Sequence, residues 1–218
     1  MNIAFYISGK GKRFRKIFNS ELEVISDTKV VFSDSSENDD LKSQLDFFGI
    51  TYTCMPYSEI HASGNNKSII LSEGMLQLFK KNNIDYVFCF GDHILKEPLI
   101  SEYENRIINF HPSILPMFPG RKALDAAMSD KSFLVGNTAH FIDAGIDTGP
   151  IIMQSISHFS VLAEGNYDSV LDLQITMLIS IYKWLKHGKI SVDNCRVKIA
   201  GATYDNTFFL PALINCIK

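Results

Sequence analysis

Short apolar runs alternate with longer amphipathic segments along most of the chain, which has 218 residues. Apolar runs of this kind are typical of buried strands, and the segments between them are typical of helices that connect parallel strands. Strands are predicted at residues 2–8, 28–34, 51–56, 84–90, 105–111, 137–143 and 149–159. Helices are predicted after the turn at 9–11 and within 38–50, 67–83, 122–130 and 166–189. This alternation predicts an α/β fold with a doubly wound, mostly parallel sheet.

The segment 166–189 is the longest predicted helix. Gly188 stands where such a helix would end, and the apolar face is typical of a helix that packs on a core. That face consists of Val170, Leu173, Met177, Ile181, Trp184 and Leu185. The sequence shows no internal repeat, low-complexity tract or linker, so residues 1–218 are predicted to form a single domain.

The composition narrows the class of protein. A formal net charge of −3 disfavours a nucleic-acid partner that would be held by many phosphate contacts. The four cysteines lie far apart and form no C-x-x-C pair, so we expect reduced thiols and no metal site. The N-terminal segment lacks the pattern of a secretory signal, and no apolar stretch approaches the roughly 20 residues of a membrane helix. We therefore expect a cytoplasmic protein with no membrane partner.

The stretch "INFHPSILPMFPG" at 108–120 contains the first candidate for chemistry. Ligands of open parallel sheets bind beyond the carboxyl ends of the strands, and Pro112 ends strand pairing directly after His111. Asn109 and His111 are alternate residues of one strand, so they share a face. An amide beside an imidazole suits acyl transfer, which must stabilise an oxyanion and move a proton. For an isolated N-x-H pair, a histidine that caps a turn is the simpler interpretation.

A second stretch, "GNTAHFIDAGIDTGPII" at 136–152, adds a carboxylate. Asp147 precedes Thr-Gly-Pro, a sequence that also favours a plain turn. Beside His111, however, Asp147 would favour the imidazolium and could accept a proton from an attacking amine.

The two stretches together, separated by a short helix, resemble the formyltetrahydrofolate-dependent formyltransferase family, and the resemblance runs from the first strand to Gln154. It implies a Rossmann-like formyltransferase core in which Asn109, His111 and Asp147 form the catalytic set. It also implies 10-formyltetrahydrofolate as co-substrate and no metal. Two loops would bind the pteridine, one largely through backbone groups. The implied residues are His93, Ile94 and Leu95 in one loop and Phe141, Ile142, Asp143 and Asp147 in the other.

We expect the acceptor to be a small-molecule amine, and a nucleotide-linked amino sugar is favoured. Purine enzymes of the family carry Gly-Ser-Asn after the first strand, whereas this chain reads "SGKGKRFRK". Two glycines and several cations at a helix start suit a diphosphate, although a solvated basic helix start remains the alternative. "PGRKALDAAM" is similar to the Gly-Arg of the sugar N-formyltransferases. The short chain most resembles the compact ones of the pseudaminic-acid type pathway, which act on a UDP-linked 4-amino sugar, so a UDP- or dTDP-linked 4-amino sugar is the expected acceptor. The predicted substrate-binding residues are Gly11, Lys12, Arg13, Phe118, Gly120 and Arg121.

Three other functions stay open. Glycinamide ribonucleotide is not excluded as the acceptor, and a formyltetrahydrofolate hydrolase would use water in place of the amine. A binding-only protein would need a defective catalytic set, and none of its members is missing. Methionyl-tRNA is disfavoured because only about 60 residues follow Gln154 and they carry no basic cluster. The apolar tail 197–218 is expected either to pack on the core or to form a homodimer contact.

Overall fold

A computed structural model of the protein describes residues 1–165 and 167–204, with side chains placed for all of these except 163–165. Seven strands form one sheet in the order β3-β2-β1-β4-β5-β6-β7. The strands are β1 (Ile3–Ile7), β2 (Thr28–Ser33), β3 (Thr51–Cys54), β4 (Tyr86–Phe90), β5 (Ile107–His111), β6 (Leu134–Phe141) and β7 (Ile151–His158). The first five pair in parallel, whereas β6 runs antiparallel to β5 and β7 runs antiparallel to β6. The sheet is therefore mostly parallel, as predicted.

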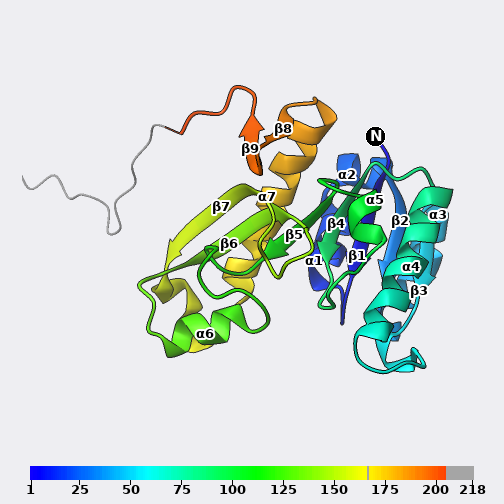
Figure 1. Ribbon diagram of the computed structural model, residues 1–218, viewed down its shortest axis with the longest axis horizontal. Helices are drawn as coiled ribbons and strands as arrows, with labels where there is room; N and C mark the ends of the chain where they lie inside the picture. Colours follow the sequence, from blue (N-terminus) through cyan, green and yellow to red (C-terminus); the bar gives the residue numbers. More distant parts are fainter. Residues whose placement is uncertain (166, 205–218) are drawn as a thin grey trace, which may run out of the picture.

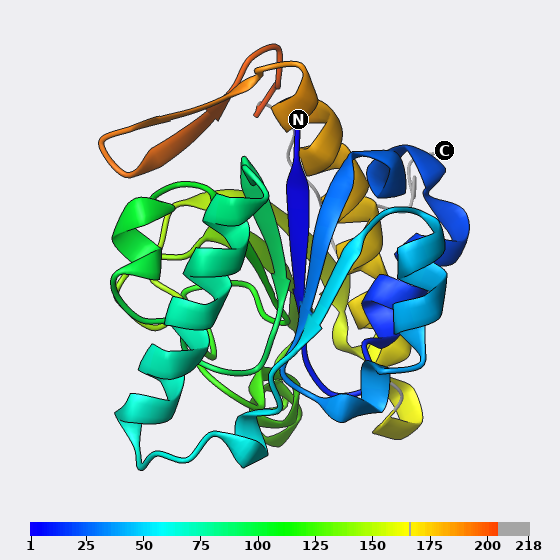
Figure 2. The ribbon, with the colours of Figure 1, turned by 90° about the vertical axis from the view of Figure 1, so that its right-hand side faces the viewer.

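Helices cover both faces of this sheet (Figures 1 and 2). One face carries α1 (Lys12–Ser20), α2 (Leu22–Asp27), α3 (Leu41–Phe47) and α7 (Asp168–Lys186), and the other carries α4 (Asn65–Lys81) and α5 (Leu99–Glu102). Helix α6 (Ala123–Ser129) closes the far end beside β6. Short 3-10 turns occupy Ser36–Asn38, Tyr57–Glu59 and Phe159–Gly165. The two covered faces confirm the doubly wound class that the alternating pattern predicts.

The parallel strands are apolar on both sides because each side packs against helices. In β1, Phe5 and Ile7 face α1 and α7, while Ala4 and Tyr6 face α4, and all four are fully buried. No helix among the described residues is long and apolar enough to cross a membrane.

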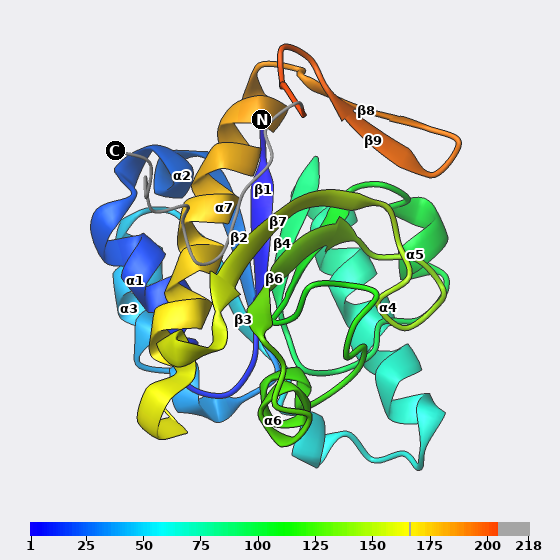
Figure 3. The ribbon, with the colours of Figure 1, turned by 90° about the vertical axis from the view of Figure 1, so that its left-hand side faces the viewer.

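A two-stranded hairpin follows α7 and was not predicted. Strands β8 (Ile190–Asp193) and β9 (Arg196–Ile199) form a small separate sheet that stands beside the end of α7 (Figures 2 and 3). Asn194 and Cys195 both have positive φ, which is the geometry of a two-residue hairpin turn. The alternating "ISVDNCRVKI" carried this signal. Most of the apolar tail, from residue 205, lies outside the described residues.

The direction of the parallel strands determines at which edge of the sheet the candidate residues lie. Strands β1, β4 and β5 are neighbours, and their carboxyl ends lie at the same edge of the sheet. His111 is the last residue of β5 and faces Thr138 of β6 across an antiparallel pair. Side chains from β5 and β6, together with the loops that leave this edge, therefore meet in one place.

Candidate active site

A cavity of about 900 Å³ opens at the carboxyl edge of the sheet. Pockets for small ligands and cofactors have volumes of roughly 300 to 1,000 Å³. The walls come from α1, the loop after β4, the end of β5, the loop before α6 and the loop between β6 and β7. Asn109, His111, His140 and Asp147 all line it.

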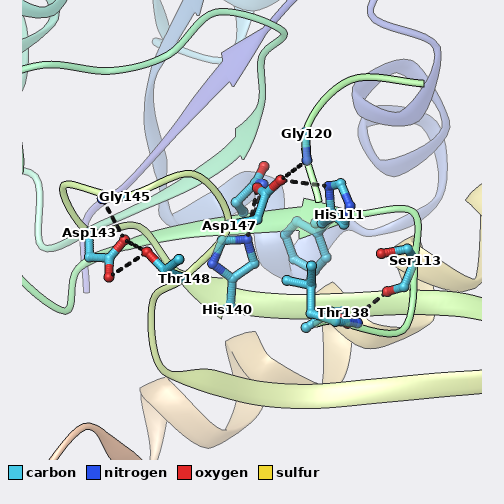
Figure 4. A network of polar contacts seen from close by, with 12 residues as sticks. His111, Ser113, Gly120, Thr138, His140, Asp143, Gly145, Asp147 and Thr148 are labelled. Carbon is cyan, nitrogen blue, oxygen red and sulfur yellow. Dashed lines mark hydrogen bonds and ion pairs between the residues drawn. The ribbon is translucent and has the colours of Figure 1, made fainter. Parts of the chain in front are cut away.

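Asp147 is the centre of the polar network in this cavity (Figure 4). Its Oδ2 lies 3.3 Å from His111 Nδ1 and accepts a hydrogen bond of 2.7 Å from the backbone N–H of Gly120. Its Oδ1 lies 3.5 Å from His140 Nε2, which in turn lies 3.2 Å from the amide nitrogen of Asn109. Residues from β5, β6 and the β6–β7 loop thus converge on one carboxylate.

In each histidine, the ring nitrogen that faces away from Asp147 forms a hydrogen bond with a backbone carbonyl oxygen. His111 Nε2 lies 2.8 Å from the Phe118 carbonyl oxygen, and His140 Nδ1 lies 2.8 Å from the Phe141 carbonyl oxygen. A carbonyl oxygen only accepts, so both of these nitrogens carry a hydrogen. His111 Nδ1 then faces the Asp147 carboxylate, whereas His140 Nε2 lies between Asp147 Oδ1 and the Asn109 amide nitrogen. A hydrogen bond between His111 Nδ1 and Asp147 Oδ2 would place a shared proton inside the cavity.

The electrostatic setting keeps the carboxylate ionised. Burial raises the pKa of Asp147, but the hydrogen bond from His140, the Gly120 N–H and the charges of His111 and His140 outweigh burial. The net effect lowers the pKa of Asp147 below its ordinary value. The side chain of Asp147 is 13% exposed, so the carboxylate remains reachable from the cavity.

The β6–β7 loop has a local structure that directs Asp147 inward. Asp143 accepts hydrogen bonds from the Gly145 N–H and the Thr148 hydroxyl, so Asp143 is the residue that stabilises the turn. Asp147 has a φ of 53°, a left-handed conformation that aspartate tolerates better than most residues. A Cβ at Gly149 would lie 1.9 Å from the Phe141 carbonyl oxygen, so only glycine fits there. The loop sequence therefore leaves the carboxylate of Asp147 free for chemistry.

Residues 1–172 match the family model described as "Formyl transferase". This chain belongs to the formyl transferase family. It is 33% identical over 171 residues to a formyltetrahydrofolate deformylase of Synechocystis sp., an alignment that covers 76% of this chain and 57% of that protein. It is also 44% identical over 61 residues to the phosphoribosylglycinamide formyltransferase of Bacillus subtilis, covering 28% of this chain and 31% of the relative. The chain thus spans less than two thirds of the length of either relative.

Solved structures agree with the family assignment. Glycinamide ribonucleotide transformylase 1 from Symbiobacterium toebii superposes with a TM-score of 0.71 at 27% identity. That superposition covers 91% of this formyl transferase chain and 93% of the other. A phosphoribosylglycinamide formyltransferase from Anaplasma phagocytophilum gives a TM-score of 0.74 at 25% identity, with 93% and 96% covered. The Rossmann-like formyltransferase fold expected from the sequence is therefore present.

His140 is a member of the site that the sequence did not reveal. It is 2% exposed and lies opposite Asn109 in the register of β5 and β6. The sequence predicted the strand at 137–143 but not its antiparallel pairing with β5. Without the pairing, a single histidine in an apolar strand carries no sign of its neighbour. A structure of the formyl transferase core was needed to place it beside Asp147.

Most of the predicted folate-binding residues line the cavity of this formyl transferase. They are His93, Ile94, Leu95, Ile142, Asp143 and Asp147. Phe141 differs, because its ring is 1% exposed and packs in the hydrophobic core with residues of α7. Phe141 contributes its carbonyl oxygen, which orients His140, and its ring offers no wall to a ligand.

The predicted substrate-binding residues divide into two groups. Arg13, Gly120 and Arg121 line the cavity, together with Lys122. Lys12 is exposed and lies outside the lining, so the expected binding of a diphosphate by Lys12 and Arg13 stays a prediction, with Arg13 the member that lines the cavity. Gly11 caps α1 with a φ of 57°, and a Cβ there would lie 2.7 Å from Asn38 Oδ1. Phe118 supplies the carbonyl that holds His111.

Proposed function

We propose that this protein transfers a formyl group from 10-formyltetrahydrofolate to the primary amine of a small phosphate-bearing acceptor. The observation that carries the proposal is the convergence of Asn109, His111 and Asp147 inside one large cavity. Loops predicted to bind folate form one part of its wall, and the cations Arg13, Arg121 and Lys122 form another. Family membership supports the same chemistry.

The fit of the folate rests on the chemistry of the wall. Ile94, Leu95, Ile142 and Ile146 offer apolar surface for a flat ring system, and the Ile94 and Ile146 side chains are about half exposed, at 50% and 56%. Apolar walls with a few placed polar groups are typical of cofactor pockets. When bound, the co-substrate supplies the formyl carbon.

The reaction needs one bond to form and one to break. The neutral amine attacks the formyl carbon, so a new C–N bond forms and the carbonyl oxygen gains negative charge. The Asn109 amide has two N–H groups, and one of them can donate to the developing oxyanion. Cleavage of the folate C–N bond then releases tetrahydrofolate as its nitrogen takes up a proton.

Asp147 and His111 are the residues that act on the proton of the attacking amine. Asp147 is ionised when the amine attacks, so it can afterwards take the proton that the amine loses. The Phe118 carbonyl accepts the other His111 hydrogen and fixes the ring. An imidazolium form of this ring, which a neighbouring carboxylate favours before it takes up a proton, would stabilise the oxyanion.

The finer proposal for the acceptor is a UDP- or dTDP-linked 4-amino sugar. Arg13, Arg121 and Lys122 supply more positive charge along the cavity than one monophosphate requires. Glycinamide ribonucleotide is the second candidate, because the named relatives include phosphoribosylglycinamide formyltransferases. The Synechocystis relative is named a deformylase, and this name favours water as a third candidate acceptor.

A panel of acceptors tests the proposal directly. Tetrahydrofolate release should be measured with 10-formyltetrahydrofolate and UDP-4-amino sugar, dTDP-4-amino sugar, glycinamide ribonucleotide or no amine. We expect release that depends on an amine and is fastest with one of the sugar nucleotides. Faster release with glycinamide ribonucleotide would overturn the sugar proposal alone. Equal release with and without every amine would identify a hydrolase.

The pH dependence of kcat/KM should follow the acceptor and not Asp147. A lowered pKa means that Asp147 is already ionised throughout pH 5 to 8, whereas the amine must lose a proton before it attacks. We expect kcat/KM to rise across this range and the rising limb to shift with the pKa of the amine. Two acceptors whose amines differ in pKa provide the measurement. A flat profile, or a limb that stays in place when the amine changes, would contradict this role of Asp147.

A further inference from the structure

Arg13 is tied to the interior by a line of buried amides. Its Nη1 donates a hydrogen bond of 2.5 Å to Gln174 Oε1 on α7. Gln174 is fully buried, and its Nε2 donates to the Phe110 carbonyl oxygen at 3.1 Å and to Asn137 Oδ1 at 2.8 Å. Asn137 is also fully buried and donates to the Val170 carbonyl oxygen at 2.8 Å. Strand β6, the end of β5, helix α7 and helix α1 meet in this network.

The network leaves Gln174 a single orientation. Both of its amide hydrogens have acceptors of fixed position, so its oxygen must face Arg13. A flipped amide would place an NH₂ group against the guanidinium and an oxygen against two other acceptors. Gln174 therefore presents one rigid acceptor to Arg13.

Arg13 differs from the neighbouring cations of α1. Arg15 pairs with Asp40 and Lys16 pairs with Asp172, both at 2.6 Å, so carboxylates neutralise their charges. Among the described residues, Arg13 forms no ion pair and donates only to the neutral Gln174. Its guanidinium carbon lies 4.6 Å from the centre of the Phe90 ring. The charge of Arg13 thus stays available at the cavity wall.

The environment makes an anion favourable at this point. Burial lowers the pKa of Arg13, and Asp92 offsets only part of this effect, which is the mark of a cation that has lost water without gaining a carboxylate. A guanidinium has five N–H donors in a planar fork, and Gln174 uses one of them. The remaining donors match the oxygens of a phosphoryl group, which guanidinium binds in bidentate geometry.

We propose that Gln174 is a positioning residue for acceptor binding: it holds Arg13 so that the guanidinium binds a phosphoryl group of the acceptor within the cavity. This inference rests on the proposed function for the identity of the acceptor. The hydrogen bond between Arg13 and Gln174, by contrast, is a feature of the structure itself. The neutral amide of Gln174 fixes the Arg13 side chain without neutralising its charge, whereas a carboxylate at the same place would neutralise it.

Inorganic pyrophosphate is the probe that tests this role without folate or amine. Its affinity should be measured by calorimetry on the full chain. We expect Arg13→Met to weaken binding by at least about tenfold, since charge-assisted hydrogen bonds are lost. Gln174→Met keeps the shape of the side chain but removes the acceptor, and we expect a loss of a similar order. In the Arg13→Met background, Gln174→Met should cause no further loss, because Gln174 acts only through Arg13.

Asp172→Asn is the matched control. It lies two residues before Gln174 on α7 and breaks the exposed ion pair with Lys16, which also links α7 to α1. Pyrophosphate should bind this variant as tightly as it binds the wild type. A similar loss in Asp172→Asn would show that general α1–α7 packing is responsible and would overturn the inference.

Gln174→Glu is the second variant, and its thermal unfolding is measured beside that of Gln174→Met because both lose the donor to Phe110 and Asn137. Glutamate preserves the length and the acceptor but neutralises Arg13, so pyrophosphate binding should again fall by at least about tenfold. Wild-type affinity in either Gln174 variant, or an equal loss in the Arg13→Met background, would overturn the inference. Pyrophosphate binding that depends on Gln174, in a protein that transfers no formyl group, would refute the proposed function and leave the subsite intact.

Discussion

Asp147→Asn is expected to lower kcat for formyl transfer by about a thousandfold, the range in which general acid–base groups act. The substitution preserves size, and asparagine tolerates the left-handed φ of 53° that this position requires. The amide cannot take a proton from the attacking amine, and it no longer stabilises a protonated His111 or His140. Single-turnover measurements with 10-formyltetrahydrofolate and the preferred acceptor would give the effect on the chemical step.

The stability of Asp147→Asn provides the control. Because the fold lowers the pKa of Asp147, the ionised carboxylate stabilises the wild type above the ordinary aspartate pKa, and this contribution is lost as pH falls through the lowered value. The variant should therefore be slightly less stable than the wild type at pH 7, and the difference should shrink in acid. Thermal unfolding of the wild type and the variant, measured at pH 7 and in acid, gives this difference in stability. Turnover within tenfold of the wild type in a folded variant would refute the role of Asp147.

His111→Ala is expected to cause the second largest loss, about a hundredfold or more in kcat, because the ring that contacts Asp147 at the reacting centre is removed. His111 is 5% exposed and donates to the Phe118 carbonyl, so the substitution also removes the partner of a partly buried acceptor. His111→Gln keeps a donor for that carbonyl and cannot carry a proton. A folded His111→Gln variant should therefore be as inactive as His111→Ala.

The coupling between the two residues gives a sharper measurement. Asp147 and His111 form one proton-holding pair, so their effects should not add. In the Asp147→Asn background, His111→Ala should lower kcat by less than about tenfold. Multiplicative losses in the double variant would show that the two residues act independently and would contradict the shared proton.

The strands of the large sheet could be predicted from the sequence because each is a short apolar run bounded by turn residues. Runs such as 84–90 become β4 since a strand covered by helices on both sides must be apolar throughout. The motif at Asn109 and His111 is equally local. Alternate residues of a strand share a face, and Pro112 ends the pairing, so both side chains had to reach the edge of the sheet.

The structure of the turn between β6 and β7 could be predicted only in part. The sequence placed Asp147 in a turn of small and acidic residues but did not tell which aspartate stabilises the turn and which faces the site. Asp143 takes the first role through Gly145 and Thr148, and this division depends on where β6 ends relative to β7. The hairpin at 190–199 was also present in the alternation of its residues, although it was not recognised.

What the sequence determined by itself is the seven strands of the large sheet, the longer helices and the family motifs, because these depend on spacing along one segment of chain. Only the tertiary structure placed His140 opposite Asn109, buried the ring of Phe141, and directed Arg13 into the cavity while leaving Lys12 in solvent. These outcomes depend on the direction of the strands, on their register and on how α1 packs against α7. Such contacts join residues far apart in the chain, for instance Arg13 and Gln174, and no periodicity within either segment records them.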